Sequence, residues 1–352
     1  MRILMLSWRG PRHPRAGGAE HYTHRVLSIL TRRGHEVTWF CEGPGAEMCD
    51  GIRIVPGPPI PALYPAGALF LARHGRAFDL AVDQINVAGF LAPLYSPVPV
   101  VALIHQLAAE VWRAETAPPW RSLGPPLEAA GLAAYRRVPF VTVSQSTLAD
   151  LRGAGWRGPG FVAYNGVELP AAAALPAKEP VPTLAFLGRW QARAKRIEHA
   201  FAAFARVRAA VPDACLWAIG RGRPPVQAPP GVTLVHDVSD RERDALLARA
   251  WLLLATSVRE GWGRMVLEAA AVGTPAAVYD VPGLGEAGRA VGATIVAPDP
   301  AALGAAVAHL LVTPQRLVAM GAEARQRVAA FTWEASAGVW EQALALAARG
   351  RG

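Results

Sequence analysis

The chain has 352 residues, a length at which a single hydrophobic core stops growing, so two domains are expected. With 52% hydrophobic and 18% charged residues, the composition excludes a disordered chain. The net charge of +9 suggests nucleic-acid binding, but all but two of the 36 basic residues are arginines, scattered without the interleaved aromatic residues of a single-strand platform. We therefore predict no nucleic-acid partner and keep an anionic substrate or membrane surface open.

Apolar strands alternate with amphipathic helices in the first half of the chain. Strands are expected over residues 2–8 and 35–42, on either side of a helix over 19–34, so the chain opens with a βαβ unit. Further strands are expected over residues 78–84, 98–106 and 138–146. This alternation is typical of an α/β fold whose parallel sheet is covered by helices on both faces.

Residues 58–76, PPIPALYPAGALFLARHGR, mix apolar and basic side chains with several prolines. The prolines favour an ordinary loop, and a segment that touches a membrane is the alternative.

Residues 170–182 are rich in proline and alanine without periodicity, which predicts a linker. The alternation of strands and helices then restarts. Strands are expected over residues 183–190, 214–222, 232–238, 250–258 and 274–280, and helices over 196–210 and 240–250. A last helix over 333–350 has no strand after it and is free to cross back to the first domain.

The cysteines indicate a reducing compartment. Cys41, Cys49 and Cys215 form neither a CxxC pair nor a metal-binding spacing. The opening MRILMLSW is too short for a signal peptide, and charges or prolines interrupt every later apolar run before membrane-spanning length. A cytoplasmic location is expected, with association at the inner face of the membrane as the alternative.

Two glutamates eight positions apart are the most informative feature of the second half. Residues 260–275 read EGWGRMVLEAAAVGTP and follow the apolar run AWLLLATSV, which predicts strand, turn and helix start. Gly261 and Gly263 allow a close backbone approach, and amides opening a helix near Arg264 favour an anion. Glu260 and Glu268 then lie on either side of that anion, although a surface loop with a solvated helix gives the same pattern.

A second pair of charged residues follows the strand over 183–190. Arg189 and Lys195 bracket a loop that can bring a guanidinium fork and an ammonium group to one pyrophosphate. Lys195 is one of only two lysines in an arginine-rich chain, which favours a functional position over a solvent-exposed cation.

Motifs in this order resemble the retaining nucleotide-sugar glycosyltransferases of family 4, which have the GT-B fold. They are GGAE at 17–20, His105 at a strand end, NGV at 165–167, GRWQARAK at 188–195, the glutamate segment, GTP at 273–275 and FTW at 331–333. The resemblance implies two Rossmann-like domains that face each other across a cleft. Residues 1–170 would bind the acceptor, residues 171–332 the nucleotide-sugar donor, and the helix over 333–352 would pack back on the first domain.

The resemblance also implies roles for individual residues. Glu260 would accept from donor-sugar hydroxyls and Glu268 from the ribose hydroxyls, which suits carboxylates facing vicinal diols. The other donor-binding residues would be Gly17, Gly18, Gly188, Arg189, Lys195, Val238, Gly261, Trp262, Gly263, Arg264, Met265 and Val266. Backbone amides around Met265 and Val266 would bind phosphate, and flexible amides at Gly17 and Gly18 would border the donor phosphates or the acceptor. His236 to Val238 would line the nucleobase pocket, without indicating which base is bound.

On the first domain, the family places the equivalent of His105 beside the donor sugar. We expect His105 to orient and support the sugar, and to act in catalysis together with Arg189, Lys195 and Glu260. The acceptor would be surrounded by Trp8, Arg12, His13, Trp112, Arg113 and Trp120, since aromatic and arginine side chains suit sugars, aglycones and anionic lipids alike.

The resemblance implies a reaction that moves a hexose-type sugar to the hydroxyl of a glycan, a lipid or a small natural product by front-face displacement. No cofactor and no metal are predicted, because the chain lacks an Asp-x-Asp motif and Arg189 and Lys195 can neutralise the leaving diphosphate.

The chain departs from the family at two places: Lys195 is followed by Arg196 where glycine is usual, and Trp262 and Arg264 stand in the glutamate motif. A dinucleotide-dependent oxidoreductase is disfavoured, because GRGRPP at 220–225 lacks the third glycine of GxGxxG. A non-catalytic nucleotide-sugar binding protein remains the alternative, and the sequence does not indicate an oligomeric state.

Overall fold

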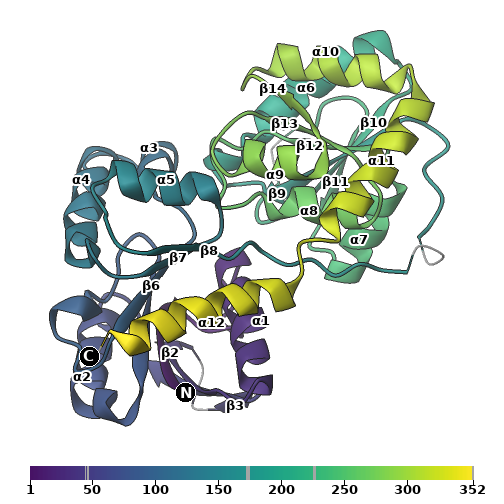
Figure 1. Cartoon of the computed structure of the whole chain (residues 1–352). Helices are drawn as coiled ribbons and strands as arrows, with labels where there is room; N and C mark the ends of the chain where they lie inside the picture. The colour runs from purple at the N-terminus through teal and green to yellow at the C-terminus, as the bar shows by residue number, and fades with distance from the viewer. Residues whose placement is uncertain (44, 46, 172–174, 225–226, 351–352) are drawn as a thin grey trace. The chain divides into compact units, whose positions relative to one another are not determined.

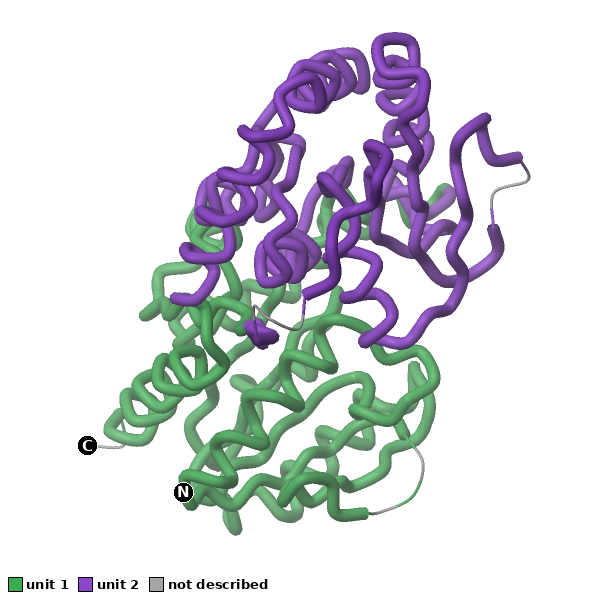
Figure 2. The backbone as a smooth tube through the Cα atoms, turned by 90° about the vertical axis from the view of Figure 1, so that its right-hand side faces the viewer, with its two compact units in different colours: residues 1–112, 118–166, 331–352 green, residues 113–117, 167–330 purple. Residues whose placement is uncertain are grey.

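The computed structural model describes residues 1–43, 45, 47–171, 175–224 and 227–350. The chain forms two compact units (Figure 2). Unit 1 comprises residues 1–112, 118–166 and 331–352, and unit 2 comprises residues 113–117 and 167–330. The main divisions fall after residues 166 and 330, whereas the sequence analysis divides the chain after residues 170 and 332.

Unit 1 is built on an eight-stranded sheet with the order β3-β4-β2-β1-β5-β6-β7-β8. All neighbouring pairs are parallel except β3 and β4, which are antiparallel at one edge. The strands are β1 (Arg2–Arg9), β2 (Glu36–Glu42), β3 (Glu47–Cys49), β4 (Ile52–Gly57), β5 (Leu80–Ile85), β6 (Val100–Ile104), β7 (Phe140–Thr142) and β8 (Gly160–Val162).

The α-helices of unit 1 come from the first half of the chain and from its C-terminal end. They are α1 (Gly18–Arg32), α2 (Leu63–His74), α4 (Trp120–Leu132), α5 (Gln145–Gly153) and α12 (Trp333–Arg349). Helix α3 (Ala109–Glu115) is divided between the two units after Trp112. The central strand β1 is buried from Ile3 to Ser7, because both faces of a parallel sheet are covered by helices or loops. Short 3-10 turns are η1 (Gly75–Ala77), η2 (Ala92–Leu94) and η3 (Ala133–Tyr135).

The C-terminal helix α12 packs on unit 1, as the sequence predicts (Figure 1). Its Trp340 is 1% exposed, and the indole Nε1 donates a hydrogen bond to the hydroxyl of Tyr22 on α1 at 2.9 Å. Ser336 donates to the carbonyl of Tyr164, and a Cβ at Gly166 would lie 2.3 Å from the amide nitrogen of Trp333. A small residue at position 166 therefore lets α12 begin directly beside the chain that leaves β8.

Replacing Trp340 with alanine is expected to lower the free energy of unfolding of unit 1 by about 3–5 kcal/mol, because it leaves a cavity and an unpaired Tyr22 hydroxyl. Denaturant unfolding measures the change. Leu346→Ala on the same helix is the control, since Leu346 is 41% exposed and surface changes stay within about 0.5 kcal/mol. Equal effects of the two substitutions would contradict the packing of α12.

Unit 2 is built on a six-stranded parallel sheet with the order β11-β10-β9-β12-β13-β14. Its strands are β9 (Thr183–Arg189), β10 (Cys215–Arg221), β11 (Val232–His236), β12 (Leu252–Ala255), β13 (Ala276–Tyr279) and β14 (Thr294–Val296). Its helices are α6 (Ile197–Ala210), α7 (Asp240–Arg249), α8 (Arg264–Ala271), α9 (Leu284–Val291), α10 (Pro300–Leu311) and α11 (Pro314–Val328), with a 3-10 turn η5 (Arg193–Lys195).

The strand order of unit 2 is that of a doubly wound dinucleotide-type sheet. Counted within the unit, the strands run 3-2-1-4-5-6, and the direction of winding reverses between β9 and β12. The loops that leave the carboxyl ends of these two neighbouring strands border the crevice in which such sheets bind ligands.

Each strand and helix expected from the sequence is present within the described residues, and most differ only at their ends. One exception is residues 145–146, which were expected in a strand but begin α5. Ser144 accepts a hydrogen bond from the amide of Thr147 at 3.1 Å and so caps a helix there.

The prediction of an ordinary loop over residues 58–76 is wrong, because Leu63–His74 form helix α2. Pro65 occupies the third position of that helix, where the backbone amide has no intrahelical partner, so the proline costs no hydrogen bond. Leu63 and Leu71 are fully buried, so one side of α2 belongs to the core of unit 1.

The predicted linker is irregular over its described residues, with positions 172–174 outside them. Its second part is nevertheless fastened to unit 2. Lys178 Nζ donates to the carbonyl of Ala250 at 2.8 Å and to the hydroxyl of Thr274 at 2.7 Å, and burial lowers the pKa of Lys178 to about 8.

No single helix among the described residues has both the length and the apolar composition to cross a bilayer. Residues 300–311 and 314–349 meet these criteria only as a pair bent by 104°.

Candidate active site

Unit 2 brings one member of each charged pair together, Lys195 from the first loop and Glu260 from the second. Lys195 ends η5 in the loop that follows β9, and Glu260 lies in the loop that follows β12. Hydrogen bonds tie these loops together: the Val258 amide donates to the Ala194 carbonyl at 2.8 Å, and the Thr256 hydroxyl donates to the carbonyls of Lys195 and Arg196 at 3.0 Å. The two loops therefore form one rigid edge at the reversal point of the sheet.

The Lys195 ammonium and the Glu260 carboxylate form an ion pair at this edge. Nζ lies 2.5 Å from Oε1, and the side chains are 20% and 16% exposed. The hydroxyl of Ser257 donates to the same Oε1 at 2.6 Å. Ser257 was missed by the sequence analysis, although its place directly after a buried strand was a usable signal.

A second carboxylate, Glu268, lies within α8 and is 11% exposed. Arg264, one turn earlier, donates from Nε to Glu268 Oε1 at 2.7 Å, and Arg243 on α7 lies 3.6 Å from the same oxygen. Burial disfavours the charge of Arg243, but the nearby Glu268 and Asp244 raise its pKa overall. Arg243 was also missed, because its helix reads as an ordinary charged surface helix.

The backbone around Glu260 depends on glycine. Gly263 precedes α8 with φ of +73°, and Gly283 has φ of +74°. A Cβ at Gly283 would lie 1.9 Å from the carbonyl oxygen of Glu260. The position of Glu260 is therefore set by a close approach between two loops of unit 2.

Gly283→Ala is expected to displace Glu260, to lower stability by about 1–3 kcal/mol and to reduce kcat/KM for sugar transfer about tenfold. Gly273→Ala is the matched control, since Gly273 has φ of +73° with no atom within 4 Å of a Cβ. Thermal unfolding and steady-state kinetics separate backbone strain from displacement. An equal loss of activity in both variants would contradict the role of the close approach.

Gly188 and Arg189 end β9, next to Gly220 and Arg221 of β10. A Cβ at Gly188 would lie 3.4 Å from Lys195 Cγ, so the lysine side chain passes close over this glycine. The Arg189 side chain is exposed and has no hydrogen bond within the described residues. It is thus open to an anionic ligand.

The residues expected near the nucleobase lie at the end of β11 and directly after it. His236 is exposed and contacts the Trp190 ring at a centroid distance of 5.4 Å, while Val238 is half-buried. Trp190 is 6% exposed, and its indole nitrogen has no hydrogen-bond partner among the described residues. Trp190 was not singled out from the sequence.

Three other predicted donor-binding residues lie in the interior. Trp262, Met265 and Val266 are 3%, 8% and 0% exposed, and the Val266 amide donates to the carbonyl of Gly263 at 2.8 Å. The Val266 amide, which was expected to bind phosphate, already donates a hydrogen bond within the protein. An anion at the start of α8 would therefore have to be bound by Arg264 and Met265. Gly261 lies in the half-buried loop before them.

In unit 1, His105 follows β6 directly and is half-buried. Burial lowers its pKa to about 4, so the ring is neutral at pH 7. The Gln84 carbonyl oxygen accepts from Thr23 at 3.0 Å, which points its amide nitrogen at His105 Nε2, 3.4 Å away. The Tyr22 ring meets the imidazole edge to face at 5.1 Å. Gln84 and Tyr22 thus position the histidine.

The glycines that open α1 differ from the sequence expectation. The Gly17 amide donates to Glu20 Oε2 at 2.7 Å, so it is already occupied, while Gly18 has open space where a Cβ would lie. Glu20 Oε1 accepts from the Trp8 indole at 2.7 Å. One carboxylate therefore fixes both the glycine turn and Trp8.

The predicted acceptor residues do not form one free surface. Arg12 pairs with Glu47 at 2.6 Å, and His13 pairs with Glu42 at 3.3 Å. Trp112 packs against the backbone of Gly124, where a Cβ would meet its ring at 2.2 Å.

Trp112 belongs to unit 1, whereas the next residue, Arg113, belongs to unit 2. Trp120 on α4 is 54% exposed.

Sequence comparisons assign both halves of the chain. Residues 16–170 match the family described as Glycosyltransferase Family 4, and residues 181–313 match the one described as Glycosyl transferases group 1. Glycogen synthase from Mycobacterium tuberculosis is 26% identical over 99% of this chain and 96% of its own length.

Solved structures with the same fold include sucrose-phosphate synthase from Thermosynechococcus elongatus, with a TM-score of 0.79 and 22% identity over 97% of both chains. Anabaena HepE, solved with UDP and glucose, gives a TM-score of 0.74 at 16% identity over 98% of this chain and 99% of its own. The chain has the GT-B architecture and belongs to glycosyltransferase family 4, whose members transfer a sugar from a nucleotide-sugar donor.

Proposed function

We propose that this protein is a retaining hexosyltransferase that moves the sugar of a nucleotide-diphosphate hexose to an acceptor hydroxyl without a metal ion. The observation that carries the proposal is the ion pair of Lys195 and Glu260 at the reversal point of the unit 2 sheet. It combines a cation suited to the diphosphate with a carboxylate suited to sugar hydroxyls.

The contacts of this pair leave binding capacity for a donor. The Lys195 ammonium has three N–H donors and directs one at Glu260, so two remain for diphosphate oxygens. Both contacts to the Glu260 carboxylate engage Oε1, which leaves Oε2 for a hydroxyl of the hexose. Arg189, exposed at the end of β9, would add a guanidinium fork to the same diphosphate.

Glu268 is assigned to the ribose hydroxyls. Arg264 and Arg243 both approach Oε1, so Oε2 is the atom available to a diol. The two arginines also fix the direction of the carboxylate, because both approach the same oxygen.

Retention of configuration follows from front-face displacement. The bond between the anomeric carbon and the diphosphate oxygen breaks, and the acceptor oxygen bonds to the same face of that carbon. The acceptor proton passes to the departing diphosphate, so no enzyme nucleophile is needed. Lys195 and Arg189 stabilise the charge that develops on the diphosphate. His105, neutral at pH 7, would orient the sugar rather than act as a charged acid.

UDP-glucose is the first donor to test, because HepE was solved with UDP and glucose and glycogen synthase is among the relatives. A thermal-shift panel of UDP-, GDP-, TDP- and ADP-hexoses identifies the donor, since a ligand of the native state raises its apparent stability. Transfer to glycan, lipid and small-molecule acceptors then separates an enzyme from the alternative, a non-catalytic nucleotide-sugar binding protein. Donor binding with no turnover on any acceptor class would favour the latter.

Chelation is expected to leave transfer unchanged within about twofold, because Lys195 and Arg189 supply the positive charge that a metal supplies elsewhere. The assay compares untreated protein with protein treated with EDTA and desalted. Loss of turnover that magnesium or manganese restores would contradict metal independence.

We place the reaction in the cytoplasm, which agrees with Cys41, Cys49 and Cys215 being free thiols. Peripheral contact with the inner face of the membrane is the alternative, and co-sedimentation with anionic vesicles distinguishes the two.

A further inference from the structure

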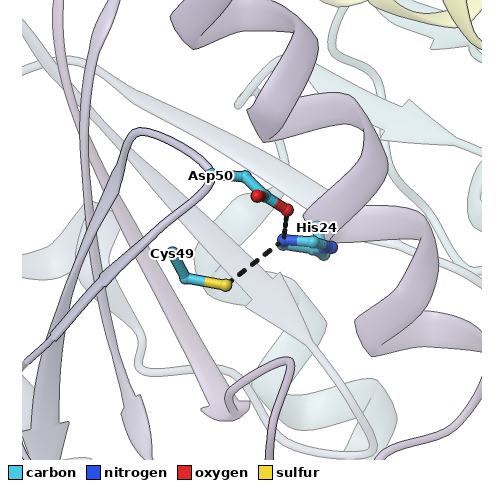
Figure 3. Close-up of side chains that lie close together, drawn as sticks. All are labelled: His24, Cys49 and Asp50. Atoms are coloured by element: carbon cyan, nitrogen blue, oxygen red, sulfur yellow. Dashed lines mark hydrogen bonds and ion pairs between the residues drawn. The ribbon is translucent and has the colours of Figure 1, made fainter.

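Three side chains from two separate segments of the chain converge at one edge of the unit 1 sheet (Figure 3). His24 comes from α1, Cys49 ends β3, and Asp50 lies in the turn between β3 and β4. His24 Nε2 lies 3.1 Å from Asp50 Oδ2 and 3.6 Å from Cys49 Sγ, and the three ligand atoms all lie within 4.8 Å of one another. These residues have no part in the proposed transfer reaction.

The two distances from His24 match the edges of a tetrahedral coordination shell. Zinc binds imidazole nitrogen and carboxylate oxygen at about 2.0–2.2 Å and thiolate sulfur at about 2.3 Å. A tetrahedral angle then separates nitrogen from oxygen by about 3.4 Å and nitrogen from sulfur by about 3.6 Å. The observed 3.1 and 3.6 Å differ from these edges by a few tenths of an ångström, so the side chains need little movement to hold an ion.

The donor set selects the class of ion. One thiolate, one imidazole and one carboxylate suit zinc and cobalt, whereas magnesium and calcium prefer oxygen ligands alone. Cys49 is 7% exposed and the His24 side chain 21%, but the Asp50 side chain is 67% exposed. The cluster is therefore shielded on the protein side and open to water on the other, which leaves a fourth position for a water ligand.

The surroundings are compatible with a cation. Burial raises the pKa of the Cys49 thiol, while the Arg12 guanidinium, which is paired with Glu47 at 2.6 Å, acts on that pKa in the opposite direction. The Asp50 carbonyl accepts from the Thr31 hydroxyl at 3.2 Å, so the turn is already joined to α1 through its backbone. The turn thus holds Asp50 in place before any ion arrives.

We propose that His24, Cys49 and Asp50 bind one zinc-class divalent ion, with water as the fourth ligand, and that this ion fastens the turn between β3 and β4 to α1. Binding releases the Cys49 thiol proton and requires a neutral His24. Without the ion, His24 Nε2 contacts the Cys49 thiol and the Asp50 carboxylate at hydrogen-bonding distance.

Cobalt(II) titration of the full chain, chelated, desalted and kept reduced, tests the proposal. The expected result is one cobalt per chain with a thiolate-to-cobalt charge-transfer band, lost on addition of zinc. Cys49→Ser should abolish the band, and His24→Gln or Asp50→Asn should weaken binding at least tenfold, in line with the loss of a ligand. Cys215→Ser is the control, because Cys215 lies in unit 2 and should leave the band unchanged.

The absence of a cobalt–thiolate band in the wild-type chain, or an unchanged band in Cys49→Ser, would overturn the proposal. Circular dichroism shows whether each variant is folded. Thermal unfolding is the second measurement. Zinc should raise the thermal midpoint of the wild-type chain more than that of His24→Gln. Equal gains would also overturn it. The measurements report metal binding only, so their failure leaves the proposed transferase function intact.

Discussion

Lys195→Ala is expected to lower kcat/KM for sugar transfer by about 10²–10³-fold, equivalent to about 2.7–4 kcal/mol of transition-state stabilisation. The ammonium would act where the diphosphate gains negative charge as the sugar bond breaks, so its loss should reduce kcat more than it raises the KM for the donor. The Glu260 carboxylate would remain, held by Ser257 at 2.6 Å but without its cation. Steady-state kinetics with the donor identified by thermal shift provides the measurement.

Arg193→Ala is the matched control for Lys195. Arg193 opens the same 3-10 turn and also carries one positive charge, but its side chain is exposed. The substitution should change kcat/KM less than about threefold at physiological salt, since exposed charges are screened. Similar losses in both variants would indicate a general effect of net charge rather than a specific role of Lys195.

Glu260→Ala is expected to reduce kcat/KM by about 10²-fold, because a hydrogen bond to a charged group contributes about 1.5–3 kcal/mol and the Lys195 ammonium loses its partner. Glu260→Gln should retain part of the activity, since the amide oxygen still accepts from Ser257 or from a hydroxyl. Glu323→Gln, which removes an exposed glutamate paired with Arg327 on α11, should have no effect on transfer.

Deoxy donors give this prediction a sharper test. A donor that lacks the hydroxyl bound by Glu260 should be a poor substrate of the wild-type enzyme, and the penalty should vanish in Glu260→Ala, because the two changes remove one interaction. If every deoxy donor shows the same penalty in both enzymes, Glu260 does not bind a sugar hydroxyl.

Local patterns predicted the elements that carry the site. The apolar run before Glu260 and the glycines after it indicated a strand, a turn and a helix start, and the structure has β12, a loop and α8 in that order. Position after a strand likewise singled out Lys195 and His105. These features depend on residues close together in the sequence, so periodicity and turn chemistry suffice to find them.

Local sequence patterns gave wrong predictions where contacts with residues outside the segment determine the structure. The prolines of residues 58–76 favoured a loop, but Pro65 falls in the first turn of α2 and Leu63 and Leu71 bury one side of the helix. The free amides expected at Gly17 and Val266 are occupied, by Glu20 and Gly263. A sequence pattern locates a loop but does not show which partner its amides take.

The sequence by itself determined the alternation of strands and helices, the family motifs and the charges of Arg189, Lys195, Glu260 and Glu268. Tertiary structure alone decided which of these charges meet.

Because β9 and β12 are neighbours in the sheet, Lys195 and Glu260 pair across 65 positions, and Arg243 reaches Glu268 from another helix. Tertiary packing likewise brings His24 of α1 to Cys49 and Asp50, although their spacing in the sequence matches no metal motif. Strand order is invisible in periodicity, since every βα unit shows the same apolar pattern whichever neighbour it takes.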